Sequence, residues 1–502
     1  MNHCLAVDLG TTHIKLGVYD ASGNQIESLT ASAKADLSRG YNVQYPDDFV
    51  HTLKEIFARL RFALSDIDVI IFSGQMAGVV GVDEQFNAVT IWSGTIDTRS
   101  LQIANPDPEK VFRVSGCMTP FSAQKILMLE QDARATKYIG LPSYVAAKLF
   151  GGSINDAFIQ ESNITWTGLV DLAERQWSDE LIELFGIDAA LLPRIAKPVD
   201  VVGEVSARAA SELGFRKGVK IIAGAGDKAA SCVGLGIRNA GDVIDESASV
   251  PSMMICVNEF RPDLENGSWE TLPGLDGDKF YLTHYMPGTG LALEWYIRTF
   301  AQKELAEAKD DIDAVYQVLE EKAIGVPAGS EGLLCVSHLA GRTLPYEPHI
   351  RGAFVGHGFR HTGAHFYRAF LESFAYEYAR VIRNCSALYP EFELSRIKSI
   401  GGGADSYLMN QIKSDVLRLE YSILGRNDYT LFGSAAIAFL ATGVWRDLDH
   451  LDDQPVKQFY IPTEENMEVY QNMTRLFDNW IEQNSDTYKE LLRLAERGAY
   501  GS

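Results

Sequence analysis

CLAVDLGTTHIKLGVYDASGNQI, residues 4–26, decides the fold class of the N-terminal part of the chain. Two apolar runs flank a polar turn, which predicts a β-hairpin. A tight hairpin needs only a pair such as Asn-Gly, yet this turn carries Asp8, a glycine, Thr11 and Thr12, with Lys15 just beyond. A carboxylate, a permissive backbone, two hydroxyls and a cation are the groups that hold a phosphate and its metal ion.

The composition indicates a globular protein with more than one core. The chain has 502 residues, of which 46% are hydrophobic and 22% charged, so we expect at least two large domains. Its net charge of −22 argues against non-specific nucleic-acid binding, which depends on Lys and Arg. The same charge argues against a polybasic membrane-surface role, although a small substrate site can still be locally positive.

The cysteines and the N-terminus indicate the cellular compartment. Six cysteines are scattered without CxxC spacing, so we expect buried free thiols rather than a disulfide framework or a zinc site. The N-terminus lacks a basic stretch followed by a signal-type apolar core, and no run of about 18 apolar residues occurs. We therefore expect a cytoplasmic protein.

Short Val- and Ile-rich runs alternate with longer helical patterns, which predicts an α/β architecture. Residues 66–75 have the pattern of a buried strand that ends in a polar turn. Residues 219–236 and 396–418 each have the pattern of a strand, a glycine-rich turn and a helix. Residues 365–385 place apolar side chains at three- and four-residue spacing, as a long helix does.

A second strand, polar turn and strand occupies residues 241–257. It repeats the pattern of the first hairpin, although not its residues, and so predicts a domain boundary near residue 240. No low-complexity stretch or long linker separates the halves. We expect two domains, residues 1–240 and 241–502, that pack closely around a cleft.

The stretch AGAGDKAA, residues 223–230, admits two functional interpretations. Its spacing fits the GxGxx[GA] dinucleotide fingerprint, and Asp245 ends a later strand as that motif requires. Alternatively, Asp227 is the chemical residue, because a carboxylate on a glycine-flanked turn can accept a proton from a bound hydroxyl, as phosphoryl transfer needs. The structural alternative for Asp227 is a helix N-cap.

Several segments, in order along nearly the whole chain, match motifs of one enzyme family. They are DLGTTHIK (8–15), SGQMAG (73–78), WSGTIDTR (92–99), TPFSAQKILMLE (119–130), AGAGDKAA (223–230), RGAFVGHGFRHTGAHFYRAFLE (351–372) and SIGGGADSYLMNQIKSD (399–415). Through these motifs the chain resembles the FGGY family of carbohydrate kinases. The resemblance implies two actin/ribonuclease H-like α/β domains with a central interdomain cleft, and ATP and Mg²⁺ as cofactors.

The resemblance implies a nucleotide and metal site. Asp8 and Asp227 would hold Mg²⁺, Asp8 through water. The residues implied to contact the phosphates or the adenosine are Thr11, Thr12, Lys15, Ser247, Ser249, Gly290, Gly402, Gly403 and Ala404.

The resemblance also implies an acceptor site with Asp227 as general base. The residues of its sugar pocket would be Gln75, Met76, Asp97, Asp227 and Lys228. Each assignment has a structural alternative: Gln75 could merely end a strand, Met76 could be a core residue, and Asp97 could pair with Arg99.

The chain departs from the family pattern at two places near this site. The second phosphate hairpin reads VIDESASV (243–250), where Asp245 and Glu246 bring negative charge in place of a Gly-Thr pair. Lys228 stands where sugar kinases often have Asn or Gln. The altered hairpin supports a second hypothesis, a catalytically weak sugar- or nucleotide-binding protein with a regulatory role.

The resemblance also limits the substrate class. GQM at residues 74–76, followed by the segment around Asp97, is most similar to xylulokinases. It implies a ketopentose such as xylulose or ribulose, or a related polyol. Glycerol is disfavoured because the Arg-Glu pair that glycerol kinases carry after Gly-Gln is absent. A homodimer is a further expectation from the family.

Overall fold

The N-terminal hairpin lies within a six-stranded sheet in the order β11-β12-β4-β1-β2-β3. Its strands are β1 (His3–Leu9), β2 (His13–Asp20), β3 (Gln25–Ser32), β4 (Val69–Gly74), β11 (Val201–Glu204) and β12 (Lys220–Ile222). β1 pairs antiparallel with β2 and places Asp8 opposite Lys15. β1 runs parallel to β4, with Leu9 beside Gly74, so the polar turn after β1 lies next to Gln75.

A seven-stranded sheet forms the second half, in the order β15-β16-β14-β13-β19-β20-β21. Its strands are β13 (Val243–Glu246), β14 (Ser252–Val257), β15 (Glu270–Pro273), β16 (Phe280–Tyr285), β19 (Ile397–Ile400), β20 (Tyr421–Leu424) and β21 (Val456–Tyr460). β13 and β14 pair antiparallel, which confirms the second strand-turn-strand unit. β13 runs parallel to β19, as β1 does to β4.

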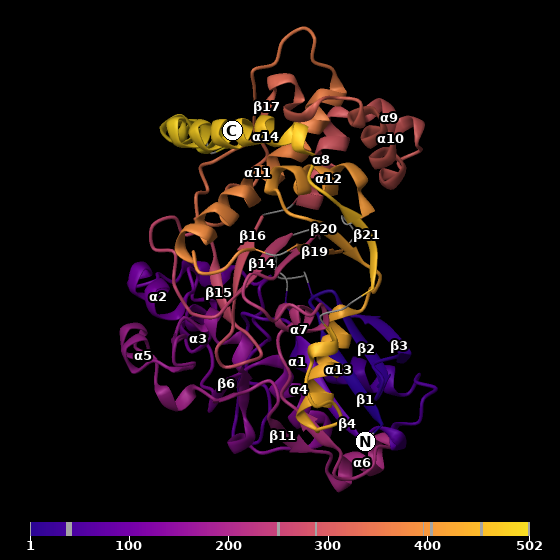
Figure 1. Ribbon diagram of the computed structural model, residues 1–502. Helices are drawn as coiled ribbons and strands as arrows, with labels where there is room; N and C mark the ends of the chain where they lie inside the picture. The colour runs from indigo at the N-terminus through magenta and orange to yellow at the C-terminus, as the bar shows by residue number, and fades with distance from the viewer. Residues whose placement is uncertain are drawn as a thin grey trace.

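The computed structural model describes residues 2–36, 43–247, 251–286, 289–394, 396–401, 405–451 and 455–499. The two sheets lie in two lobes, with the N-terminus in the lower lobe and the last helix in the upper one (Figure 1). The predicted two-domain α/β fold is therefore confirmed.

Helices and short strands complete the lower lobe around the first sheet. The helices are α1 (Pro46–Phe57), α2 (Pro108–Ser115), α3 (Phe121–Leu129), α4 (Leu141–Phe150), α5 (Asp179–Phe185), α6 (Ala207–Leu213) and α7 (Asp227–Gly234). The short strands are β5 (Val80–Val82), β6 (Lys137–Ile139), β7 (Phe158–Gln160), β8 (Val170–Asp171), β9 (Gln176–Trp177) and β10 (Arg194–Ala196).

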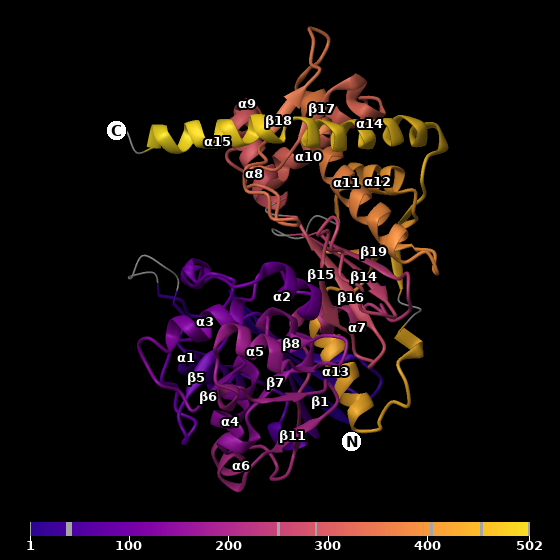
Figure 2. The ribbon, with the colours of Figure 1, turned by 90° about the vertical axis from the view of Figure 1, so that its left-hand side faces the viewer.

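The upper lobe packs around α11 (Gly363–Leu388), which confirms the predicted long helix. Its other elements are α8 (Thr289–Phe300), α9 (Gln302–Glu307), α10 (Ile312–Ile324), α12 (Tyr407–Leu417), α14 (Glu464–Gln483), α15 (Ser485–Ala499), β17 (Leu334–Val336) and β18 (Ala353–Val355). Figure 2 shows α14 and α15 running one after the other across the upper lobe. None of the helices within the described ranges combines the length and apolar composition that a bilayer span needs.

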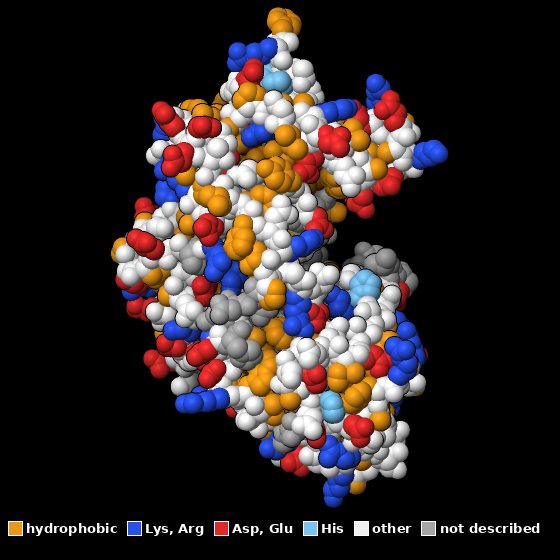
Figure 3. Space-filling view, turned by 45° about the vertical axis from the view of Figure 1, so that its right-hand side comes forward, with side chains coloured by type: hydrophobic (Ala, Val, Ile, Leu, Met, Phe, Trp, Pro, Cys, Tyr) orange, Lys and Arg blue, Asp and Glu red, His pale blue; other side chains and the backbone are white. Residues whose placement is uncertain are grey.

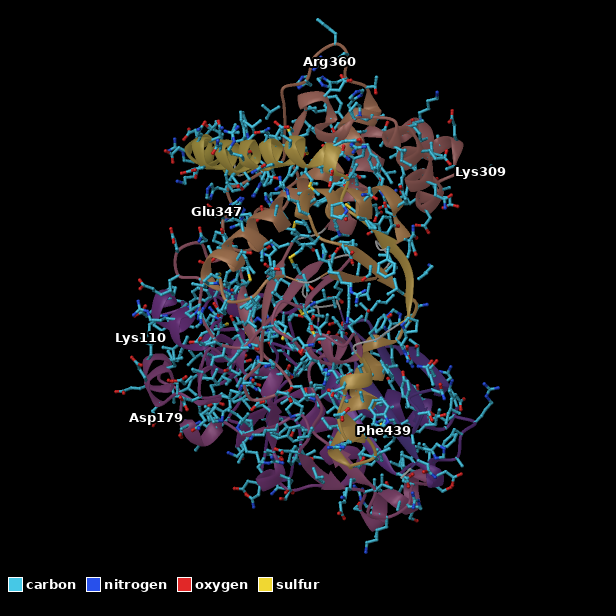
Figure 4. The ribbon with its side chains drawn as sticks, in the orientation of Figure 1. Lys110, Asp179, Lys309, Glu347, Arg360 and Phe439 are labelled. Carbon is cyan, nitrogen blue, oxygen red and sulfur yellow. The ribbon has the colours of Figure 1, made fainter. Side chains whose placement is uncertain are left out.

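One helix from the second half, α13 (Tyr429–Ala441), packs in the lower lobe beside β1 and α7 (Figure 1). Figure 4 shows Phe439 of α13 among the side chains of that lobe, where it is fully buried. The helices approach closely because a Cβ added to Gly433 would lie 1.8 Å from the carbonyl oxygen of Ala230. A domain boundary near residue 240 remains a prediction: the strands of the two sheets fall on either side of it, whereas α13 does not follow it.

Candidate active site

Two neighbouring cavities lie between the lobes, where Figure 3 shows the surface deeply hollowed. The smaller cavity has a volume of about 220 Å³. It is lined by Asp8, Gly10, Thr12, His13, Lys15, Asp227, Lys228, Ser231, Glu246 and Thr430. The first hairpin, α7, β13 and the start of α13 thus meet around one polar space.

Asp8 lies one residue before the end of β1, with its carboxylate on the smaller cavity. Ser73 Oγ donates a hydrogen bond to Asp8 Oδ1 at 3.3 Å. Burial, followed by the charge of Asp227, raises the pKa of Asp8 to about 7. A cation bound beside this carboxylate would stabilise its charged form.

The turn after β1 brings the predicted phosphate-binding residues to the cavities. A Cβ added to Gly10 would lie 2.5 Å from the carbonyl oxygen of His13, so the turn requires glycine there. Thr12 and Lys15 line the smaller cavity, and both are exposed. Thr11 lines the larger cavity instead, so the structure separates the two threonines.

Asp227 is the first residue of α7, and the N-cap is Gly226. The N-cap interpretation of Asp227 is therefore wrong. Asp227 Oδ1 accepts a hydrogen bond from the backbone N–H of Lys228 at 2.7 Å, and burial raises the pKa of Asp227. Asp227 lines both cavities, so its carboxylate lies where the two spaces meet.

Lys228 and Glu246 form an ion pair between α7 and β13. Lys228 Nζ lies 2.6 Å from Glu246 Oε2 and 3.0 Å from Ser252 Oγ. Burial opposes the charged form of Lys228, but the charges of Glu246 and Asp227 outweigh it and raise the pKa of Lys228. The two departures from the family pattern therefore contact each other, which the separate sequence segments could not reveal.

The larger cavity has a volume of about 1050 Å³ and receives residues from both halves of the chain. Four of the five residues predicted for the sugar pocket line it: Gln75, Met76, Asp227 and Lys228. Its apolar walls include Met118, Phe121, Trp166 and Tyr285, with Leu264 and Tyr346 from loops of the second half. Of these apolar lining residues, Phe121 lies in the motif at residues 119–130, whereas the others lie outside the motifs of the sequence analysis.

The amide of Gln75 is engaged inside the protein. Its Nε2 donates to Gly10 O at 3.3 Å and to Gln44 Oε1 at 3.2 Å, and its Oε1 accepts from Trp92 Nε1 at 3.0 Å. Gln75 therefore ties the turn after β1 to the wall of the larger cavity. Met76 is 6% exposed and belongs both to this wall and to the apolar core.

Asp97 is buried in an ion pair and lines neither of the two cavities described above. Arg99 Nε and Nη2 lie 2.8 and 2.7 Å from its two carboxylate oxygens, and Ser93 Oγ donates to Oδ2 at 2.8 Å. The structure therefore contains the Asp97–Arg99 pair that is the structural alternative for Asp97. The Asp97 side chain in this pair is buried, and that of Arg99 is partly exposed. Thr95, two residues earlier, does line the larger cavity.

Lys125 is a buried cation beside the larger cavity that the sequence did not single out. Its Nζ donates to the carbonyl oxygen of Ala77 at 2.6 Å, and Ala77 has a left-handed backbone with φ of 58°. Burial lowers the pKa of Lys125 to about 7. Lys125 lies among buried residues of α3, at a helix position that is normally apolar. A lysine at an otherwise core-facing position is the signal that could have identified it.

The predicted nucleotide residues of the second half are only partly described. Ser247 Oγ donates to Asp245 Oδ2 at 3.0 Å and accepts from Lys413 Nζ at 3.0 Å, so this hydroxyl is engaged within the lobe. Gly290 is the second residue of α8. The remaining predicted residues lie outside the described residues: Ser249, Gly402, Gly403 and Ala404.

The donor set of the smaller cavity fits Mg²⁺ bound together with phosphates. Mg²⁺ is usually held by one or two carboxylates plus phosphate oxygens and water, rather than by a cage of protein ligands. Asp8 and Asp227 offer two carboxylates on one cavity. Within the described ranges no cluster of three or more His, Cys, Asp or Glu side chains suits a metal ion.

Comparison with known proteins identifies the family. Residues 3–234 match the N-terminal domain, and residues 252–442 the C-terminal domain, of the FGGY family of carbohydrate kinases. A xylulose kinase of Lactococcus lactis is 26% identical over 99% of this chain and 100% of its own. An autoinducer-2 kinase of an Enterobacter species is 26% identical over 94% of this chain and 93% of its own.

The fold is that of solved structures in the same family. The structure of a ligand-bound xylulose kinase from Lactobacillus acidophilus has a TM-score of 0.86 at 20% identity, over 98% of this chain and 100% of that one. The protein is a phosphotransferase with an alcohol group as acceptor, and carbohydrate kinases of this kind use ATP. Both halves of the chain, and the order of the motifs within them, place it in the FGGY family of carbohydrate kinases.

Proposed function

We propose that this protein transfers the γ-phosphate of Mg-ATP to a hydroxyl of a small sugar, a ketopentose such as xylulose or ribulose, or a related polyol. The observation that carries the proposal is the position of Asp227, which lines both the smaller and the larger cavity. A general base for transfer between two substrates must reach the acceptor hydroxyl while the phosphate lies in line with it.

The smaller cavity is proposed to take the phosphates. Thr12, the backbone around Gly10 and Lys15 supply hydroxyl, N–H and ammonium groups on one side of it, as phosphate-binding concavities do. Asp8 and Asp227 would hold Mg²⁺, which when bound supplies positive charge to the phosphate oxygens. Asp8 is held in place by Ser73.

The larger cavity is proposed to take the acceptor. Asp227 would receive the proton of the attacking hydroxyl, and its raised pKa makes it a better base than an exposed aspartate. Met76, Trp166 and Tyr285 offer apolar surface to the C–H faces of a sugar. Gln75 acts here as a positioning residue, because its amide is bound to Trp92, Gln44 and Gly10.

The similarity of GQM at residues 74–76 to xylulokinases supports the ketopentose class. The name of the Lactococcus lactis relative supports it too, although the name of the Enterobacter relative shows that similar chains act on other small acceptors. At 26% identity the choice among them belongs to experiment. From the resemblance to the family we also expect a homodimer.

A coupled ADP-release assay with Mg-ATP and a panel of ketoses, aldoses, polyols, aldonates and glycerol tests the proposal. We expect one ketopentose or polyol to raise ADP release far above the rate without acceptor. A flat panel, with Mg-ADP binding still detected by calorimetry, would overturn it in favour of the regulatory binding protein.

A further inference from the structure

We propose that Lys228 is a second catalytic residue, whose ammonium group neutralises the phosphoryl group as it passes from the smaller cavity to the larger one. The inference rests on the proposed function, because it places the phosphates of ATP in the smaller cavity. It assigns to Lys228 a contact with the transferred phosphate rather than with the sugar alone.

The position of Lys228 carries the inference. Among the residues that the structure describes, Lys228 is the one Lys or Arg that lines the larger cavity, and Lys15 is the one other that lines the smaller. Lys228 therefore faces both the donor and the acceptor space. Lys15, on β2 opposite Asp8, lines only the smaller cavity.

The base and this cation are consecutive residues at the start of α7. The backbone N–H of Lys228 donates to Asp227 Oδ1 at 2.7 Å, which orients the base, while Glu246 and Ser252 hold the ammonium. Preorganised charges that lie where new charge develops lower the barrier most in a site with little water. Lys228 has 18% of its side chain exposed, so it meets that condition.

Glu246 holds the ammonium in the unliganded protein. Lys228 Nζ binds Glu246 Oε2 and Ser252 Oγ, which uses two of its three N–H donors. Three carboxylates, those of Asp8, Asp227 and Glu246, line the smaller cavity. Without Lys228 the cavity would present these negative charges with Lys15 as the remaining described cation, which disfavours a phosphate.

The chemical step balances with these residues. The bond from the γ-phosphorus to the bridging oxygen breaks and its electron pair leaves with ADP, while the acceptor oxygen forms a new bond to that phosphorus. The acceptor proton passes to the carboxylate of Asp227. Lys228 exchanges no proton, and its ammonium compensates the charge of the phosphoryl oxygens throughout.

The rival explanation is that the ion pair only joins α7 to β13. K228Q and E246Q both break this pair, but only K228Q removes the ammonium. The double variant K228Q/E246Q also removes it and leaves no unpaired charge, so it keeps the test valid if K228Q alone does not fold. The unliganded melting temperature of each variant checks its folding.

The first readout is nucleotide binding without acceptor. Calorimetry gives the affinities of Mg-ADP and of the Mg complex of the β,γ-imido analogue of ATP, and their ratio measures the gain from the γ-phosphate. We expect K228Q and the double variant to bind Mg-ADP within about threefold of wild type but to lose the γ-phosphate gain by about 10-fold or more. E246Q should keep or increase that gain, because it frees the ammonium.

The second readout is kcat with the best acceptor of the panel. We expect K228Q and the double variant to lose about 10²–10³-fold, as when one preorganised charge-stabilising donor is removed. Equal behaviour of K228Q and E246Q, or a double variant that matches wild type in both readouts, would overturn the role of Lys228. A wild-type protein that binds neither Mg-nucleotide would instead overturn the proposed function, and this inference with it.

Discussion

Asp8, near the end of β1, and Asp227, at the first residue of α7, line one cavity, and the charge of Asp227 adds to burial in raising the pKa of Asp8 to about 7. Two carboxylates held together away from water disfavour each other's charged form. The unliganded protein therefore carries an electrostatic cost at the place where a bound cation would reduce it.

The first prediction concerns Asp8→Asn. The folded pKa of Asp8 lies above its unfolded value of 3.8, so ionised Asp8 destabilises the fold above about pH 7, and the cost disappears as the pH falls toward 4. Asp8→Asn should therefore raise the free energy of unfolding of the unliganded protein at pH 8 by on the order of 1–4 kcal/mol. Urea unfolding at pH 8 and pH 5 measures this, and a variant less stable than wild type at pH 8 would contradict it.

The same variant should lose the effect of Mg²⁺ on nucleotide binding. In wild type we expect Mg²⁺ to tighten ADP binding, and in Asp8→Asn this tightening should fall by about 10-fold, because a charge-assisted contact to the hydrated ion is lost. Calorimetry with ADP in Mg²⁺ and in EDTA compares the two conditions on one sample. An unchanged Mg²⁺ effect would remove Asp8 from the metal site.

The second prediction concerns the buried Lys125. Burial lowers its folded pKa from 10.5 to about 7, so between these values the unfolded chain holds a proton that the folded protein has lost. Lys125 therefore makes stability rise with pH over this window, by up to about 1.4 kcal/mol per pH unit. Lys125→Met should reduce this rise. Urea midpoints of both proteins at pH 7, 8 and 9 give the two slopes, and parallel slopes would refute the assignment.

The third prediction concerns the contact between α7 and α13. A Cβ at Gly433 would lie 1.8 Å from Ala230 O, so Gly433→Ala must push the helices apart. We expect a loss of about 2–5 kcal/mol of stability and lower turnover, because α7 carries Asp227. Gly325→Ala is the matched control, because nothing lies within 4 Å of its added Cβ and its φ is −75°. Equal stability of the two variants in urea would contradict the close packing.

Local sequence patterns predicted the elements that hold the candidate site. The hairpin at residues 4–26, the buried strand that ends at Gly74 and the hairpin of β13 and β14 all occur in the structure. These patterns succeed because strand and turn preferences act over a few residues. They bring the carboxylate of Asp8 and the turn after it to the end of the first sheet where β1 and β4 both finish.

Contacts between distant segments could not be predicted in this way. The ion pair of Lys228 and Glu246, the ties of the Gln75 amide to Trp92 and Gln44, and the packing of α13 in the lower lobe join residues far apart in sequence. No periodicity encodes such pairs, since each depends on the final arrangement of the two sheets. From the sequence alone, Lys228 and Glu246 differ from the family pattern and Gln75 resembles a sugar ligand; their partners are visible only in the folded chain.

The most direct measurement compares Asp227→Asn with wild type in the ADP-release assay, using the best acceptor of the panel. Asp179→Asn is the matched control, because Asp179 is also the first residue of a helix but is exposed at the periphery of the lower lobe (Figure 4). We predict that Asp227→Asn lowers acceptor-dependent turnover by about 10²–10⁴-fold, while Mg-ADP binding stays within about threefold and Asp179→Asn behaves as wild type. Turnover of Asp227→Asn equal to that of wild type would contradict the assignment of Asp227 as the general base.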